Sequence, residues 1–100
     1  MAKSRHELDV ELRAICPNVY FQQPSKGMKY PCILYSLVGK PAQFADNVRY
    51  LPFNQYDIKV ITHNPDEPMV EQMLSAFENI SFDRPYKADN LYHNVFTLYY

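Results

Sequence analysis

Three histidines, two cysteines and a short acidic stretch are the side chains that could carry chemistry in this 100-residue sequence. His6, His63 and His93 form no HxH, HxxxH or HExxH pattern, and neither cysteine lies at a zinc-ligand spacing from them. We therefore interpret the histidines as surface or hydrogen-bonded structural residues. His63 follows an expected strand, a position that carries sites in parallel α/β folds, but the sheet expected here is not parallel.

The two cysteines, Cys16 and Cys32, are also expected to be structural. Cys16 lies at the end of an expected helix, where the helix dipole raises the pKa of a thiol. Cys32 lies in an apolar run, where a thiol behaves as a small buried hydrophobe. Their spacing is not CxxC and no secretory signal is recognised, so we expect reduced thiols in a cytosol. A Cys–His nucleophile pair stays open as an alternative.

The acidic residues Asp66, Glu67 and Glu71 precede or begin an expected helix. Carboxylates are favoured there by the positive end of the helix dipole, whereas a divalent ion would require more converging oxygens than these three supply. The only glycines are Gly27 and Gly39, which excludes a glycine-rich phosphate loop. The sequence therefore predicts no catalytic site, no metal and no cofactor, and we expect that the protein is not an enzyme.

The composition disfavours two further classes of function, nucleic-acid binding and membrane spanning. Ten basic and eleven acidic residues give a net charge of −1, which disfavours sequence-specific nucleic-acid binding. No apolar run is long enough to span a membrane. Nine tyrosines and six phenylalanines are a high aromatic load, and tyrosine is enriched at protein–protein contacts. The length predicts a single domain over residues 1–100.

The first elements that would hold these side chains are a helix and two strands. Ser4 and Glu7 fit a capping box, and an apolar stripe follows at Leu8, Leu12 and Ile15 before Pro17 ends the helix. Residues 18–23 are rich in β-formers and predict a strand. Residues 32–38 form a nearly continuous apolar run, which predicts a central strand covered on both faces.

Residues 54–77 show the clearest periodicity in the chain. Tyr56, Ile58 and Val60 alternate with polar residues, as in a strand with one buried face. Beyond a break at 64–66 the sequence predicts a helix with Asp66 as N-cap and Pro68 in its first turn. Its apolar stripe comprises Met69, Val70, Met73, Leu74 and Phe77.

The remaining residues predict two more strands. Residues 80–83 are expected to form a short strand, with Arg84 and Pro85 as a turn and a brief extended piece at Tyr86. Residues 91–100 are expected to form the last strand, with Tyr92, Phe96, Leu98 and Tyr100 on one face. The order α-β-β-β-α-β-β predicts an α+β fold with two helices and a mainly antiparallel sheet.

The segment from Gly39 to Phe53 is the least regular part, with Pro41 and Pro52 as further interruptions. Val48, Tyr50 and Phe53 could begin the next strand and make a long hairpin arm. Two interpretations stay open, a plain surface loop and an arm that reaches a partner.

Three stretches carry a resemblance to a known family: PCILY at 31–35, ADN at 45–47 followed by Tyr50, and YDIKVITHNPDEP at 56–68. In this order and spacing, and with an aromatic last strand, the sequence resembles the tail-terminator, or tail-completion, proteins of phages with long non-contractile tails. The resemblance extends over most of the chain.

The resemblance implies a structural protein of the virion, assembled in the host cytoplasm and placed at the tail–head junction. Such proteins form a ring, usually a hexamer, that caps the tail tube, ends its polymerisation and joins the tail to the head and neck. The implied partners are further copies of the chain, the tail tube protein and a neck or head-completion protein, with DNA passing through the lumen.

We expect the arm from Gln43 to Phe53 to meet the neighbouring subunit or the tube. The predicted contact residues are Phe44, Asp46, Asn47, Arg49, Tyr50 and Phe53. Two alternatives remain, namely another neck component such as a head-completion stopper or connector, and a small α+β enzyme or ligand-binding domain.

Overall fold

The computed structural model describes residues 4–22, 29–39 and 53–100. Seven elements occur in these ranges, in the predicted order α-β-β-β-α-β-β. They are α1 (Arg5–Ile15), β1 (Val19–Phe21), β2 (Cys32–Gly39), β3 (Gln55–Thr62), α2 (Met69–Ala76), β4 (Ile80–Ala88) and β5 (Leu91–Tyr99).

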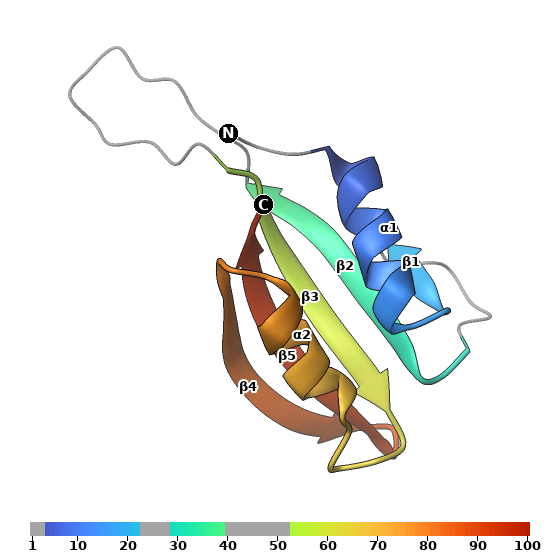
Figure 1. Ribbon diagram of the computed structural model, residues 1–100. Helices are drawn as coiled ribbons and strands as arrows, with labels where there is room; N and C mark the ends of the chain where they lie inside the picture. The colour runs from blue at the N-terminus through green and yellow to red at the C-terminus, as the bar shows by residue number, and fades with distance from the viewer. Residues whose placement is uncertain (1–3, 23–28, 40–52) are drawn as a thin grey trace.

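The strands form one five-stranded sheet in the order β1-β2-β3-β5-β4. β1 pairs with β2 in parallel, and the other three pairs are antiparallel. Both helices lie on the same face of the sheet, α1 over β1 and β2 and α2 over β5 and β4 (Figure 1). The predicted α+β class with a mainly antiparallel sheet is therefore confirmed.

The core lies between the helices and this face of the sheet. Strand residues that alternate in sequence point into it, as the period of two requires. α1 contributes Leu8 and Leu12, which are fully buried, and α2 contributes Met69 and Met73. Burying one such side chain stabilises the fold by about 1.5–3 kcal/mol. The strand residues in the core include Val19, Ile33, Tyr35, Tyr56, Ile58, Val60, Phe96 and Leu98.

α1 is fixed to β2 by a buried tyrosine. The Tyr35 hydroxyl donates to Oδ1 of Asp9 at 2.9 Å and accepts from Nη1 of Arg5 at 3.3 Å. Arg13 Nε donates to the other Asp9 oxygen at 2.7 Å. Burial alone would raise the Asp9 pKa, but hydrogen bonds from Arg13 and Tyr35 and the nearby positive charges outweigh it and hold this pKa below its usual value. The predicted cap is also present, since Ser4 Oγ accepts from the Glu7 amide at 3.2 Å.

The structure corrects the prediction for residues 80–88. Arg84 and Pro85 do not form a turn but lie inside β4, paired with Val95 and Asn94. Proline is tolerated because β4 is an edge strand, where an amide facing away from β5 has no partner to lose. The irregularity in the sequence corresponds to a register shift between Phe82 and Arg84, a β-bulge.

The predicted start of the second helix was also wrong. Asp66 is not the N-cap, because α2 begins at Met69 with Pro68 in the capping position. A side-chain turn occupies the preceding residues: Thr62 Oγ1 accepts from the Asn64 amide and donates to its carbonyl. The Asn64 side chain then accepts from the Asp66 amide at 3.0 Å, which keeps Asp66 in the turn.

The third correction concerns β2, which was predicted to be covered on both faces. β2 is an inner strand, and Ile33 and Tyr35 are buried against the helices. Leu34 and Ser36 point to the other face and are only half-buried, since no described helix covers that side. Burial on one face requires apolar side chains only at alternate positions of β2, so the run at 32–38 contains more apolar residues than this burial requires.

We predict that Tyr35→Phe destabilises the protein by about 1–2 kcal/mol, because it removes both hydrogen bonds between β2 and α1 and leaves their partners partly buried. Urea unfolding measures the change. Tyr92→Phe is the matched control, because the Tyr92 hydroxyl makes no hydrogen bond to a described residue. Equal unfolding midpoints for the two variants would contradict this role for Tyr35.

Candidate protein-binding site

Of the six predicted contact residues, only Phe53 lies within the described part of the chain. Phe44, Asp46, Asn47, Arg49 and Tyr50 lie outside the described residues. Phe53 is half-buried just before β3 and lines the hollow described next. That Phe53 contacts another subunit or the tube stays a prediction.

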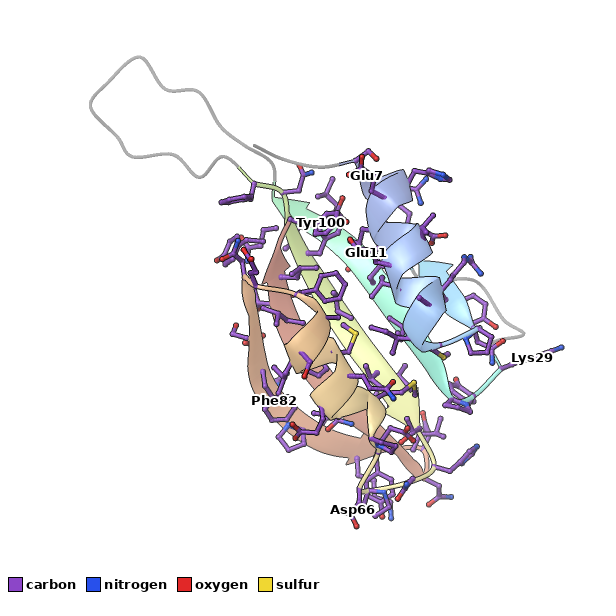
Figure 2. All side chains as sticks on the ribbon, viewed as in Figure 1. Glu7, Glu11, Lys29, Asp66, Phe82 and Tyr100 are labelled. Atoms are coloured by element: carbon purple, nitrogen blue, oxygen red, sulfur yellow. The ribbon has the colours of Figure 1, made fainter. Side chains whose placement is uncertain are left out.

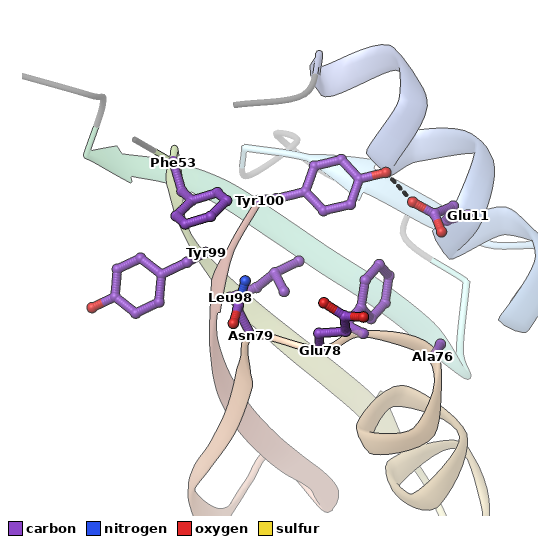
Figure 3. A pocket seen from close by; sticks show the side chains of 9 residues that line it. Glu11, Phe53, Ala76, Glu78, Asn79, Leu98, Tyr99 and Tyr100 are labelled. Carbon is purple, nitrogen blue, oxygen red and sulfur yellow. Dashed lines mark hydrogen bonds between the residues drawn. The ribbon is translucent and has the colours of Figure 1, made fainter. Parts of the chain in front are cut away.

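The hollow has a volume of about 340 Å³ and opens at the end of the sheet where β3 begins and β5 ends (Figure 3). Its wall is formed by α1, by the chain just before β3, by the chain from the last residue of α2 to β4, and by the end of β5 with the residue that follows it. Those lining it are Glu11, Phe53, Ala76, Phe77, Glu78, Asn79, Leu98, Tyr99 and Tyr100. Four aromatic rings and two carboxylates therefore converge here from distant parts of the sequence.

Tyr100 connects these elements. Its hydroxyl donates to a carboxylate oxygen of Glu11 on α1, and its ring packs edge-on against Phe77 with centroids 6.0 Å apart. Its backbone exchanges two hydrogen bonds with Asn54, of 2.9 and 3.0 Å. Tyr100 is 7% exposed as a residue, so it closes the core beneath the hollow.

A second hollow of about 390 Å³, shallow and wide open to solvent, adjoins the first and shares Glu11 and Tyr100 with it. It adds Val10, whose side chain is 55% exposed, together with His6 and Glu7. Figure 2 shows Glu7, Glu11 and Tyr100 at one end of the molecule, with Asp66 at the other. We call the joined surface the acidic groove and define it by Glu7, Val10, Glu11, Phe77, Glu78 and Tyr100.

The acidic groove has one sign of charge. Among the described residues that line the two hollows are three glutamates and neither lysine nor arginine. The arginines of α1 are engaged elsewhere: Arg5 lies 4.3 Å from the centroid of the Phe21 ring, and Arg13 pairs with Asp9. Carboxylates beside aromatic rings attract a cation, both through charge and through the ring faces.

The helix-free face of the sheet is a second candidate surface. Its central row runs across the strands through Leu34, Lys59, Val95 and Arg84. The next row pairs Ser36, Asp57, Thr97 and Ser81, and a shallow hollow of about 120 Å³ lies beside Leu34 and Lys59. Charges of both signs alternate here, so this face lacks the single sign that distinguishes the acidic groove.

The histidines and cysteines lie outside the groove, apart from His6 at its edge. His63 packs edge-on against Tyr30, and His93 stacks on Tyr86 with centroids 4.6 Å apart. The Cys16 thiol lies 3.5 Å from the carbonyl oxygen of Pro31, and burial, with the nearby Cys16 thiol as a smaller contribution, raises the pKa of Cys32 to about 12. Both cysteines are free and buried.

No three or more His, Cys, Asp or Glu side chains in residues 4–22, 29–39 and 53–100 are placed to hold a metal ion. Within the same ranges, no helix has the length and apolar character needed to cross a membrane.

No family model, no curated protein and no solved structure matches this chain. Sequence reasoning missed Glu11, Glu78 and Tyr100 as a group because they are far apart in the chain. The only local signal was Val10, an apolar residue on α1 outside the Leu8–Leu12 stripe.

We predict that neither thiol of the native protein reacts with Ellman's reagent at pH 8, because both are buried and the Cys32 thiol stays protonated far above that pH. Both should react after unfolding in guanidinium chloride. The Cys32→Ala variant, which keeps one thiol, assigns any residual reaction. Rapid labelling of native Cys16 would contradict its burial and revive the nucleophile interpretation.

Proposed function

We propose that this protein is a ring-forming structural protein of a long, non-contractile phage tail, which caps the tail tube, ends its polymerisation and joins the tail to the head. Two separate arguments support the proposal. The connection between β2 and β3 supports a role in assembly, and the ordered motifs support the tail terminator among assembly proteins.

The β2–β3 connection is the observation that carries the proposal. These strands are adjacent and antiparallel, and Gly39 pairs with Gln55 at their common end. A hairpin between such strands needs only two to five residues. Here the chain from 40 to 54 makes the connection, and its sequence contains Phe44, Tyr50 and Phe53. Length and aromatic content that the sheet does not require support a contact with another protein.

The first and third motifs contain residues that determine the fold, whereas the second motif lies in the chain that connects β2 and β3. Tyr35 of the first motif fixes α1, and Tyr56 and Ile58 of the third are core residues. Thr62 and Asn64 of the third motif form the turn before α2. The second motif, ADN with Tyr50, falls in the β2–β3 connection. If the family shares this fold and makes its contacts through the β2–β3 connection, two motifs should lie in the fold and one in the connection. The motifs are distributed in this way.

Ring formation sets a modest energetic requirement for each contact. A closed ring uses head-to-tail contacts, in which one surface of a copy meets a different surface of the next. A ring that then binds a matching ring of tube subunits engages several sites at once and gains avidity without strong individual contacts. Weak, partly polar contacts, such as the acidic groove and the helix-free face of the sheet could make, are sufficient for a ring to bind a tube.

We predict that the purified protein forms rings of about six copies and that Phe44→Ala/Tyr50→Ala prevents both ring formation and normal termination of tails. Loss of the two aromatic side chains removes the apolar part of the proposed contact. Native mass spectrometry measures the assembly, and electron microscopy measures tail length in infected cells.

The control is Leu74→Ala, which removes an apolar side chain that is 37% exposed on α2. This variant should form rings and give tails of normal length. Normal rings and tails from the double variant would refute the role of the connection. Rings that bind only to filled heads, and not to isolated tubes, would instead indicate another neck component.

A further inference from the structure

The acidic groove combines two features that together define what it can bind. Its floor is aromatic, with Tyr100 and Phe77 in edge-on contact, and its walls carry Glu7, Glu11 and Glu78. A purely apolar ligand would remove the charges of Glu7 and Glu78 from water without supplying a counter-charge, and a free cation would leave Val10 and the rings exposed. The groove therefore fits a peptide segment in which basic and apolar residues are interspersed.

We infer that the acidic groove of one copy binds residues 40–52 of the neighbouring copy. This segment contains four large apolar or aromatic residues and carries Lys40 and Arg49 against one acidic residue, Asp46. Its charge and apolar content thus complement those of the groove. The inference rests on the proposed function, because it names the receiving surface for the contact that a ring requires.

The position and the length of the segment 40–52 agree with binding to the groove of an adjacent copy. The segment is joined to Gly39 and Phe53, and Phe53 itself lines the first hollow, so segment and groove belong to the same end of the molecule. Residues 40–52 can reach at most about 20 Å out and back from that end. This distance is about twice the diameter of a helix, which is enough to reach a groove on an adjacent copy.

Ring closure requires that residues 40–52 bind the groove of the neighbouring copy and not the groove of their own copy. A segment bound in its own groove would satisfy the groove's charge but would leave no head-to-tail contact through this surface. A segment bound in the next copy's groove uses one donor surface and one acceptor surface per chain, which is the arrangement that closes a ring.

Reversing the charge of the groove or of the segment tests whether residues 40–52 bind the acidic groove. Mixing the two variants tests whether the segment comes from the neighbouring copy. The groove variant Glu7→Lys/Glu78→Lys and the segment variant Lys40→Glu/Arg49→Glu should each raise the concentration needed for ring assembly by at least about tenfold. The control Glu67→Lys/Glu71→Lys makes the same change of charge just before α2 and in its first turn, and should assemble like the unaltered protein. Glu67 follows Asp66, which Figure 2 shows at the opposite end of the molecule from Glu7, Glu11 and Tyr100. Circular dichroism verifies that all variants fold.

An equimolar mixture of the groove variant and the segment variant gives the decisive result. If the segment binds the neighbour's groove, the two reversed surfaces match alternately around the ring, and the mixture should form rings at the concentration that suffices for the unaltered protein. If the segment binds its own groove, both chains stay mismatched and mixing restores nothing, which would overturn the inference. Isotope labelling of one variant lets native mass spectrometry count both chains in each ring.

Failure of the inference is distinguishable from failure of the proposed function. Groove-variant rings that assemble as readily as the control would refute the groove contact while the ring-forming function stands. An unaltered protein that stays monomeric at high concentration and does not cap tubes would refute both.

Discussion

The helix-bearing face of the sheet is longer than the helices that cover it. β3 and β5, with 8 and 9 residues, extend about 26–30 Å, whereas α1 and α2, with 11 and 8 residues, rise only about 16 and 12 Å. One end of the apolar face must therefore be closed by other means. Phe77, Tyr100 and Phe53 close it, and the acidic groove is the surface that this arrangement leaves between the two helices.

Sequence patterns correctly predicted the helices and strands whose buried positions recur at a regular spacing within a few residues. The Ser4 cap with Leu8 and Leu12 identified α1, and the alternation of Tyr56, Ile58 and Val60 identified β3. The failures occurred where a distant partner decides the conformation. β4 continues through Pro85 because β5 pairs with it at a sheet edge, and no local pattern reports which strand lies at an edge.

Of the predicted contact residues, Phe53 lines the first hollow, and its role as a contact stays a prediction. The rest of the acidic groove depends on how far each helix extends over the sheet and on a contact between Glu11 and Tyr100, which are far apart in sequence. These are three-dimensional properties without a sequence motif. The same holds for the charge of the groove, since the residues around Glu11 in sequence include Arg13, which pairs with Asp9 and not with the groove.

The central claim is that this chain acts through the surfaces it offers to other copies and to a tail tube. The most direct measurement of this proposal is electron microscopy of the purified, unaltered protein mixed with isolated tubes of the long, non-contractile tail that it is proposed to cap. The account predicts a single ring at one end of each tube and no further growth when tube subunits are added. Bare tube ends that continue to elongate, beside a protein that stays monomeric, would contradict it.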